Sequence, residues 1–213
     1  MRMRKSFALT FMAGFAALLS AVSQPVSAGS AACSGASCTT PNVDLIFQVV
    51  IPQVVRLRIG SPAPGAADTI LFDMTSTPQL VGDATSPAVT GTGGDVGGGE
   101  VNVQVLANGG ATSVQVDADV DGGGQGIACS SGACTPGIDW INWADIQVAQ
   151  GGVACSVPPP ALDNGGSGFA TYTPAGGGIL NEVCTWQYTY AHTEFPVNGT
   201  YQGIVTYTAT VTP

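Results

Sequence analysis

Three aspartates, each separated from the next by one residue, come closest in this sequence to a metal-binding pattern. Asp117, Asp119 and Asp121, followed by Gly122, match the opening D-x-D-x-D-G of a calcium loop, which supplies carboxylate oxygens as ligands. The match ends at the twelfth position, where Ala128 replaces the required Glu. The same spacing arises on the solvent face of a β-strand, where alternate side chains point outward. We therefore expect a strand, with a weak calcium site as the alternative and no other cofactor.

The cysteines predict three disulfides. Their spacing favours two bridges across four-residue loops and a third between the two remaining cysteines, among fifteen formal pairings. Zinc binding is the competing interpretation, but the spacing is looser than in a zinc knuckle and an export signal opposes it. Disulfides imply an oxidising compartment. The expected pairs are Cys33–Cys38, Cys129–Cys134 and Cys155–Cys184.

The sequence contains no clear pattern for catalysis or for sugar binding. His192 is the only histidine, and no G-x-S-x-G, H-E-x-x-H or phosphate-loop motif is present, so we expect no enzyme. Trp140 and Trp143 fall on opposite faces of a regular strand and cannot form a flat platform. Trp186, Tyr188 and Tyr190 share a face with Cys184, which favours packing in the core over stacking on sugars.

The first 28 residues predict a secretory signal. Arg2, Arg4 and Lys5 precede the apolar run Phe7–Val22, and Val26–Ala28 supplies small residues for cleavage. We expect export through the periplasm to the extracellular space or cell surface, with no transmembrane segment in the mature chain. That chain would keep two arginines against fourteen acidic residues, a net charge of −12. This balance excludes nucleic acid and anionic membrane surfaces as partners.

Residues 29–42 form a lead of small residues, and 43–213 are expected to form a single domain. Val43–Ile59 is its longest apolar segment, and Pro52 divides it, because proline cannot donate to a ladder. Val54–Ile59 alternates as a strand with one wet face. Asp44–Val50 is apolar on both faces and needs cover on both sides.

Low charge, frequent glycine turns and many β-branched residues predict an all-β fold. Asn108-Gly109-Gly110 predicts a hairpin that joins two alternating strands. We expect an antiparallel two-sheet β-sandwich of immunoglobulin-like or jelly-roll topology, tied by disulfides. Its expected strands are Val54–Ile59, Thr69–Met74, Glu100–Leu106, Thr112–Asp121, Asp139–Val148, Phe169–Thr173, Glu182–Tyr190 and Thr200–Thr212.

The closing strand carries a resemblance. Gly199–Ala209 reads GTYQGIVTYTA, and with the signal sequence, the early apolar strand and the disulfides it resembles secreted bacterial pilin-like proteins, including the spore-coat-protein-U type. The resemblance implies an immunoglobulin-like sandwich that polymerises by donating an N-terminal strand to a neighbour.

The expected function is that of a secreted structural protein, a subunit of an extracellular fibre, pilus or surface layer that assembles by β-strand addition. The expected partners are other copies or other surface-protein subunits. The alternative is a monomeric surface adhesion module that binds carbohydrate or another ligand. The residues expected to mediate assembly are Leu45, Ile46, Phe47, Val49 and Val50.

Overall fold

The computed structural model describes most of the chain after the predicted signal, in two compact units. The units are Met1–Val50 and Ile51–Pro213. The predicted signal over residues 1–28 lies outside the described residues, as do Gly109 and Gly110 of the predicted hairpin turn. The described residues are 32–39, 43, 45–63, 65, 67–108, 113–121, 123–164, 167–173 and 178–212.

The described part of the first unit contains no strand. Cys33 and Cys38 lie 5.8 Å apart between Cα atoms and form a disulfide around an exposed turn. The described residues Leu45–Val50, within the segment expected to need cover on both faces, pair with no strand in the described part of the chain. A strand that is apolar on both faces needs a layer on each side, and no strand in the described part of the chain supplies one.

The second unit is built of β-strands and two short 3-10 helices, with no α-helix among its described residues. No helix in the described part of the chain is long and apolar enough to cross a membrane. The elements are β1 (Val55–Ile59), β2 (Ile70–Leu71), η1 (Pro78–Leu80), β3 (Val89–Thr90), β4 (Thr92–Gly93), β5 (Glu100–Ala107), β6 (Ser113–Val120), β7 (Ile127–Gly132), β8 (Trp140–Ile141), η2 (Trp143–Asp145), β9 (Ile146–Gln150), β10 (Ser167–Tyr172), β11 (Leu180–Tyr190), β12 (Gly199–Gln202) and β13 (Val205–Thr212).

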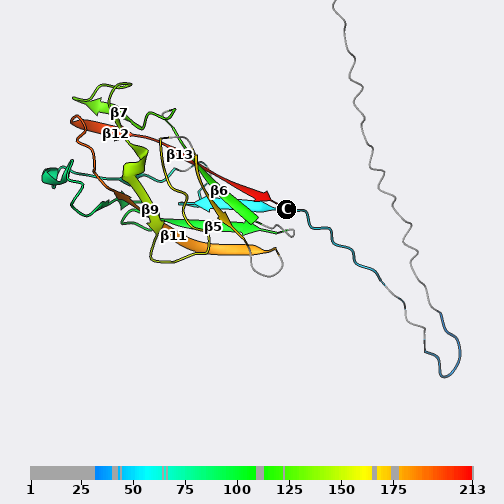
Figure 1. The fold of residues 1–213 in the computed structure, drawn as a ribbon. Coiled ribbons are helices and arrows are strands. Elements are labelled where there is room, and N and C mark those ends of the chain that lie inside the picture. The colour runs from blue at the N-terminus through cyan, green and yellow to red at the C-terminus, as the bar shows by residue number, and fades with distance from the viewer. Residues whose placement is uncertain are drawn as a thin grey trace, which may run out of the picture. The chain divides into compact units, whose positions relative to one another are not determined.

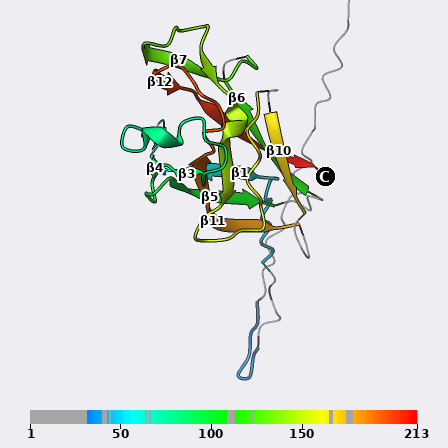
Figure 2. The same ribbon diagram turned by 60° about the vertical axis from the view of Figure 1, so that its left-hand side comes forward.

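Two antiparallel sheets form the layers of a sandwich. The first has the order β1-β5-β11-β3, with β9 also paired to β11, and the second has the order β10-β6-β13. Figure 1 shows β5 beside β11 and β6 beside β13. A small third sheet has the order β12-β7-β8. Figure 1 and Figure 2 show its strands β7 and β12 far from the C-terminal end of β13. The prediction of an all-β, disulfide-tied sandwich is confirmed.

The core lies between the two sheets, and the central strands β5 and β6 alternate between buried and outward residues. In β5 every second residue from Val101 to Ala107 is buried, and β6 repeats the pattern from Val114 to Val120. Burying each valine contributes about 1.5–3 kcal/mol relative to leaving it exposed. Aromatic residues of β11 complete this layer, among them Trp186, Tyr188 and Tyr190.

The predicted hairpin between β5 and β6 is wrong. β5 pairs with β1 and β11, whereas β6 pairs with β10 and β13, so the chain changes sheets between Ala107 and Ser113. Alternation places the valines of each strand on one face, and this pattern suits two strands facing across a core as well as two neighbours within a sheet.

Two predicted strands are interrupted. The closing strand divides into β12 and β13 at Gly203 and Ile204, where a Cβ on Gly203 would overlap the indole of Trp143. The segment Asp139–Val148 divides into β8, η2 and β9. Its break is stabilised by the side chain of Asn142, which accepts a hydrogen bond from the N–H of Ala144 at 2.9 Å.

Candidate functional site

A run of large apolar side chains is exposed at Leu45–Val50, which we call the arm. The side chains of Leu45, Ile46, Phe47, Val49 and Val50 are between 72% and 85% exposed, with Phe47 the most exposed. These are all the residues that the sequence predicted for assembly. Contiguous apolar surface of this kind marks interaction sites in folded proteins.

The chain that follows the arm is held by Asn108. Its Oδ1 accepts a hydrogen bond from the N–H of Val54 at 2.6 Å, and its Nδ2 donates to the carbonyl of Pro52 at 3.3 Å. Its backbone N–H donates to the carbonyl of Val54 at 3.1 Å. The β1–β5 ladder ends at Val55 and Ala107, so Asn108 prolongs the contact to Pro52. The sequence indicated only a turn here, because Asn before glycines is also typical of hairpins.

A shallow apolar depression of about 380 Å³ lies beside Asn108. It has no titratable side chain in its lining, so it offers no group for acid–base or nucleophilic chemistry. It is lined by Val54, Leu106, Ala107, Asn108, Ile179, Leu180 and Asn181.

The edge strands β1 and β13 lie next to each other but form no ladder of backbone hydrogen bonds. We call their two facing edges the seam. Among the described strands, β1 is an edge strand of the first sheet and β13 is an edge strand of the second. Cα atoms of the two strands approach within 8 Å. Edge strands leave backbone N–H and C=O groups available to another strand. Inward side chains are only half-buried here, whereas those of β5 and β6 are fully buried. The half-buried ones are Leu57, Ile59, Val205, Tyr207, Ala209 and Val211.

The aromatic side chains of β11 line the core rather than an exposed platform. Trp186 is 0% exposed, and its ring centroid lies 5.7 Å from that of Tyr207 in β13. The hydroxyls of Tyr188 and Tyr207 share a hydrogen bond of 2.8 Å. Burial raises the pKa of Tyr188 to about 12, and burial together with Tyr188 raises the pKa of Tyr207 further. The predicted core role of Trp186, Tyr188 and Tyr190 is therefore confirmed.

The aspartates of the calcium pattern follow the outer face of β6. Asp117 accepts a hydrogen bond from Nε2 of Gln115 at 2.6 Å, and Asp119 is exposed. Asp121 lies just beyond the strand. Within the described residues no group of three or more His, Cys, Asp or Glu side chains is placed to hold a metal ion. Calcium binding at these residues gains no support from this arrangement.

His192 lies in a buried polar cluster that the sequence did not indicate. Its side chain is 0% exposed, its φ is +45°, and its Nε2 lies 3.0 Å from the carbonyl oxygen of Pro87. The ring of Tyr190 packs edge-on against it at 6.0 Å between centroids. Thr193 donates a hydrogen bond to the nearby buried carboxylate of Asp145. The side chain of His192 thus contacts a carbonyl and an aromatic ring, which position the turn.

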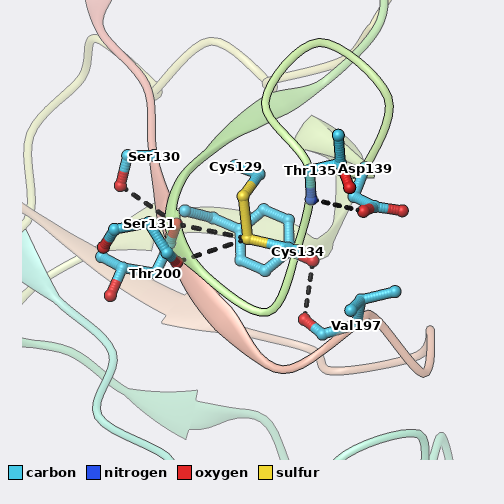
Figure 3. Close-up of a disulfide and its surroundings, with 9 residues drawn as sticks. Cys129, Ser130, Ser131, Cys134, Thr135, Asp139, Val197 and Thr200 are labelled. Carbon is cyan, nitrogen blue, oxygen red and sulfur yellow. Dashed lines mark hydrogen bonds between the residues drawn. A yellow bond between two sulfur atoms is a disulfide. The ribbon is translucent and has the colours of Figure 1, made fainter.

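The three predicted disulfides are confirmed. Cys129–Cys134 and Cys155–Cys184 join Cα atoms 5.9 and 5.1 Å apart within the second unit. Figure 3 shows the Cys129–Cys134 bridge beside Thr200 of β12, whose carbonyl accepts a hydrogen bond from Oγ of Ser130 at 3.0 Å. Three bridges indicate an oxidising, non-cytoplasmic compartment.

The arm and the seam are the features whose exposure most needs a partner. The arm, in the first unit, presents exposed apolar side chains. The seam, in the second unit, presents strand edges that have no ladder partner among the described strands. In comparisons with protein-family models, with curated proteins and with solved structures, no match to this chain was found.

Proposed function

We propose that this protein is a secreted structural subunit of an extracellular fibre, pilus or surface layer whose copies join by β-strand addition. The arm of one copy forms a strand along the seam of the next. The exposure of five large apolar side chains in the arm carries this proposal. Each gains about 1.5–3 kcal/mol when it is buried, which offsets the roughly 1–2 kcal/mol of backbone entropy lost per ordered residue.

The seam provides the strand edges with which the arm could form backbone hydrogen bonds. An added strand there gains backbone hydrogen bonds and covers side chains that are half-buried in the single copy. Hydrogen-bonded strands lie about 4.8 Å apart, so a strand between both edges needs roughly 10 Å. The arm therefore pairs with one edge, or β1 and β13 separate to admit it.

Asn108 favours a neighbouring copy over the arm's own chain. For the arm to fold back onto β1, the chain would have to turn at Pro52–Val54. That turn would have to form at residues that Asn108 holds by three hydrogen bonds, and any distortion there would weaken them. Each hydrogen bond contributes about 0.5–1.5 kcal/mol, so folding back is penalised and addition to another copy is not.

The variant Phe47→Asp tests the proposal, with Gln48→Asp as its matched control. Both place one negative charge in the arm, but Gln48 is already polar and lies on the other face of an extended segment. At about 0.5 M salt, which screens contacts between charged faces, electron microscopy and sedimentation of the mature protein should show linear polymers for the parent and for Gln48→Asp, and monomers for Phe47→Asp. Parent protein that stays monomeric at all concentrations, or polymers unaffected by Phe47→Asp, would overturn the proposal and favour a monomeric adhesion module.

A further inference from the structure

The two arginines of the second unit lie on the outer face of the edge strand β1. Arg56 pairs in register with Leu106 and Arg58 with Gln104, and the residues of β5 between them point into the core. Within the described chain neither guanidinium forms an ion pair, and Nε of Arg58 is covered without a hydrogen-bond partner. They are the only basic residues after position 5.

A row of carboxylates with matching spacing lies on the outer face of β6. Asp117 and Asp119 pair in register with Thr208 and Thr206 of β13, on the side of the sheet away from the core. Alternate residues of a strand lie about 6.7 Å apart, so the two aspartates and the two arginines have the same separation. Together with Asp121, they are the only acidic residues in the sequence spaced two apart.

We propose that the outer face of the β1-β5-β11 sheet of one copy docks on the outer face of the β10-β6-β13 sheet of another. Arg56 and Arg58 of the first copy form ion pairs with Asp117 and Asp119 of the second. The two faces lie on opposite sides of the sandwich, so one copy cannot satisfy both rows itself. The contact is heterologous and repeats from copy to copy, which arranges them side by side.

Charge makes this contact selective. Without the predicted signal, each copy would carry fourteen acidic residues against two arginines, so copies repel one another in most orientations. The two complementary rows make one orientation favourable and set its register, as charged rows do in other interfaces. This lateral contact uses the outer face of β1 rather than its free backbone edge and does not involve the arm, so it does not depend on strand addition.

The test uses the full mature chain carrying Phe47→Asp, which removes strand addition. Sedimentation should detect self-association at about 20 mM salt that is largely lost at about 0.5 M salt, where the Debye length falls to roughly 4 Å. Adding Arg56→Glu and Arg58→Glu should weaken the association by about tenfold or more. Adding Asp117→Arg and Asp119→Arg instead should weaken it equally.

An equimolar mixture of the two reversed variants should recover the association of the parent. The mixture has the same total charge as the parent, so recovery reports matched rows rather than net charge. If reversal disturbs the fold, as judged by near-ultraviolet circular dichroism, neutral Gln replacements of the arginines and Asn replacements of the aspartates should each weaken association. Mixing the two neutral variants should restore pairs, through the intact Arg row of one chain and the intact Asp row of the other, but no larger assemblies.

Association that ignores salt, a mixture that does not recover, or no association of the Phe47→Asp chain at any salt concentration would overturn this inference. None of these outcomes bears on polymers formed through the arm. Conversely, salt-sensitive association in a chain that forms no linear polymers would overturn the proposed function and leave the lateral contact standing.

Discussion

The hydroxyl oxygens of Tyr188 and Tyr207 lie 2.8 Å apart and join β11 of one sheet to β13 of the other. The ring of Tyr207 also packs on Trp186, at 5.7 Å between centroids. Tyr207 belongs to the seam, so this pair connects the edge proposed to receive an added strand with the buried aromatic layer. The pair therefore helps to hold β13 in place against the first sheet.

Replacing Tyr207 with Phe should lower the free energy of unfolding by about 1 kcal/mol, because the hydroxyl of Tyr188 then loses its partner inside the core. Urea unfolding of Tyr207→Phe, Tyr188→Phe and the double variant measures the coupling. We expect the double variant to cost less than the sum of the single variants. Strict additivity would mean that the two hydroxyls do not interact.

Stability should fall at alkaline pH. Burial raises the pKa of Tyr188 to about 12 from the usual value of about 10, so the folded state favours the protonated phenol. The contribution of this group is complete below pH 10 and is lost as the pH rises towards 12. Urea midpoints measured between about pH 8 and pH 11 should fall with pH. The fall should be smaller in Tyr188→Phe, where only the other buried tyrosines remain.

Asn108→Ala should loosen the start of β1. It removes two side-chain hydrogen bonds, each of which contributes about 0.5–1.5 kcal/mol. Amide exchange at Val54 should become faster, while exchange at Leu57 within the ladder should change little. Asn108→Asp keeps an acceptor for Val54 and should exchange at a rate between Ala and the parent. Equal exchange in all three proteins would show that the side chain does not hold Val54.

The two disulfides of the second unit should differ in their contribution to stability. Cys155–Cys184 spans 29 positions and should contribute about 3–4 kcal/mol by loop entropy. Cys129–Cys134 spans 5 positions and should contribute only about 2 kcal/mol. Paired alanine variants compared by urea unfolding measure this difference. An equal loss in both variants would show that burial or local strain outweighs loop length.

Much of the fold could be predicted from local patterns. Alternation located β5, β6, β11 and β13, and cysteine spacing predicted all three bridges. Pairing could not be predicted in the same way, because the inward valines of β5 and β6 match equally well across a core and within one sheet. The break at Gly203 depends on the position of Trp143, which is distant in sequence. The choice between immunoglobulin-like and jelly-roll topology stays a prediction.

The candidate site was only partly visible in the sequence. The arm was found because its residues are apolar on both faces, but the sequence left open whether its own domain or a neighbour covers it. The seam could not be predicted from the sequence. The inward side chains of β13 are half-buried because β13 is an edge strand, and the sequence does not show which strands lie at the edges of the two sheets. The role of Asn108 was missed since its contacts to Pro52 and Val54 join residues more than fifty positions apart.

The continuity of Pro52–Val54 with β1 has a mechanical consequence. A pull on Ile51 along the axis of β1 would load the ladder to β5 in shear, because its hydrogen bonds lie perpendicular to the strands. The five rungs and the Asn108 contacts would then share the force instead of breaking one after another. A subunit linked to its neighbour through this segment would resist tension at the point where the load enters.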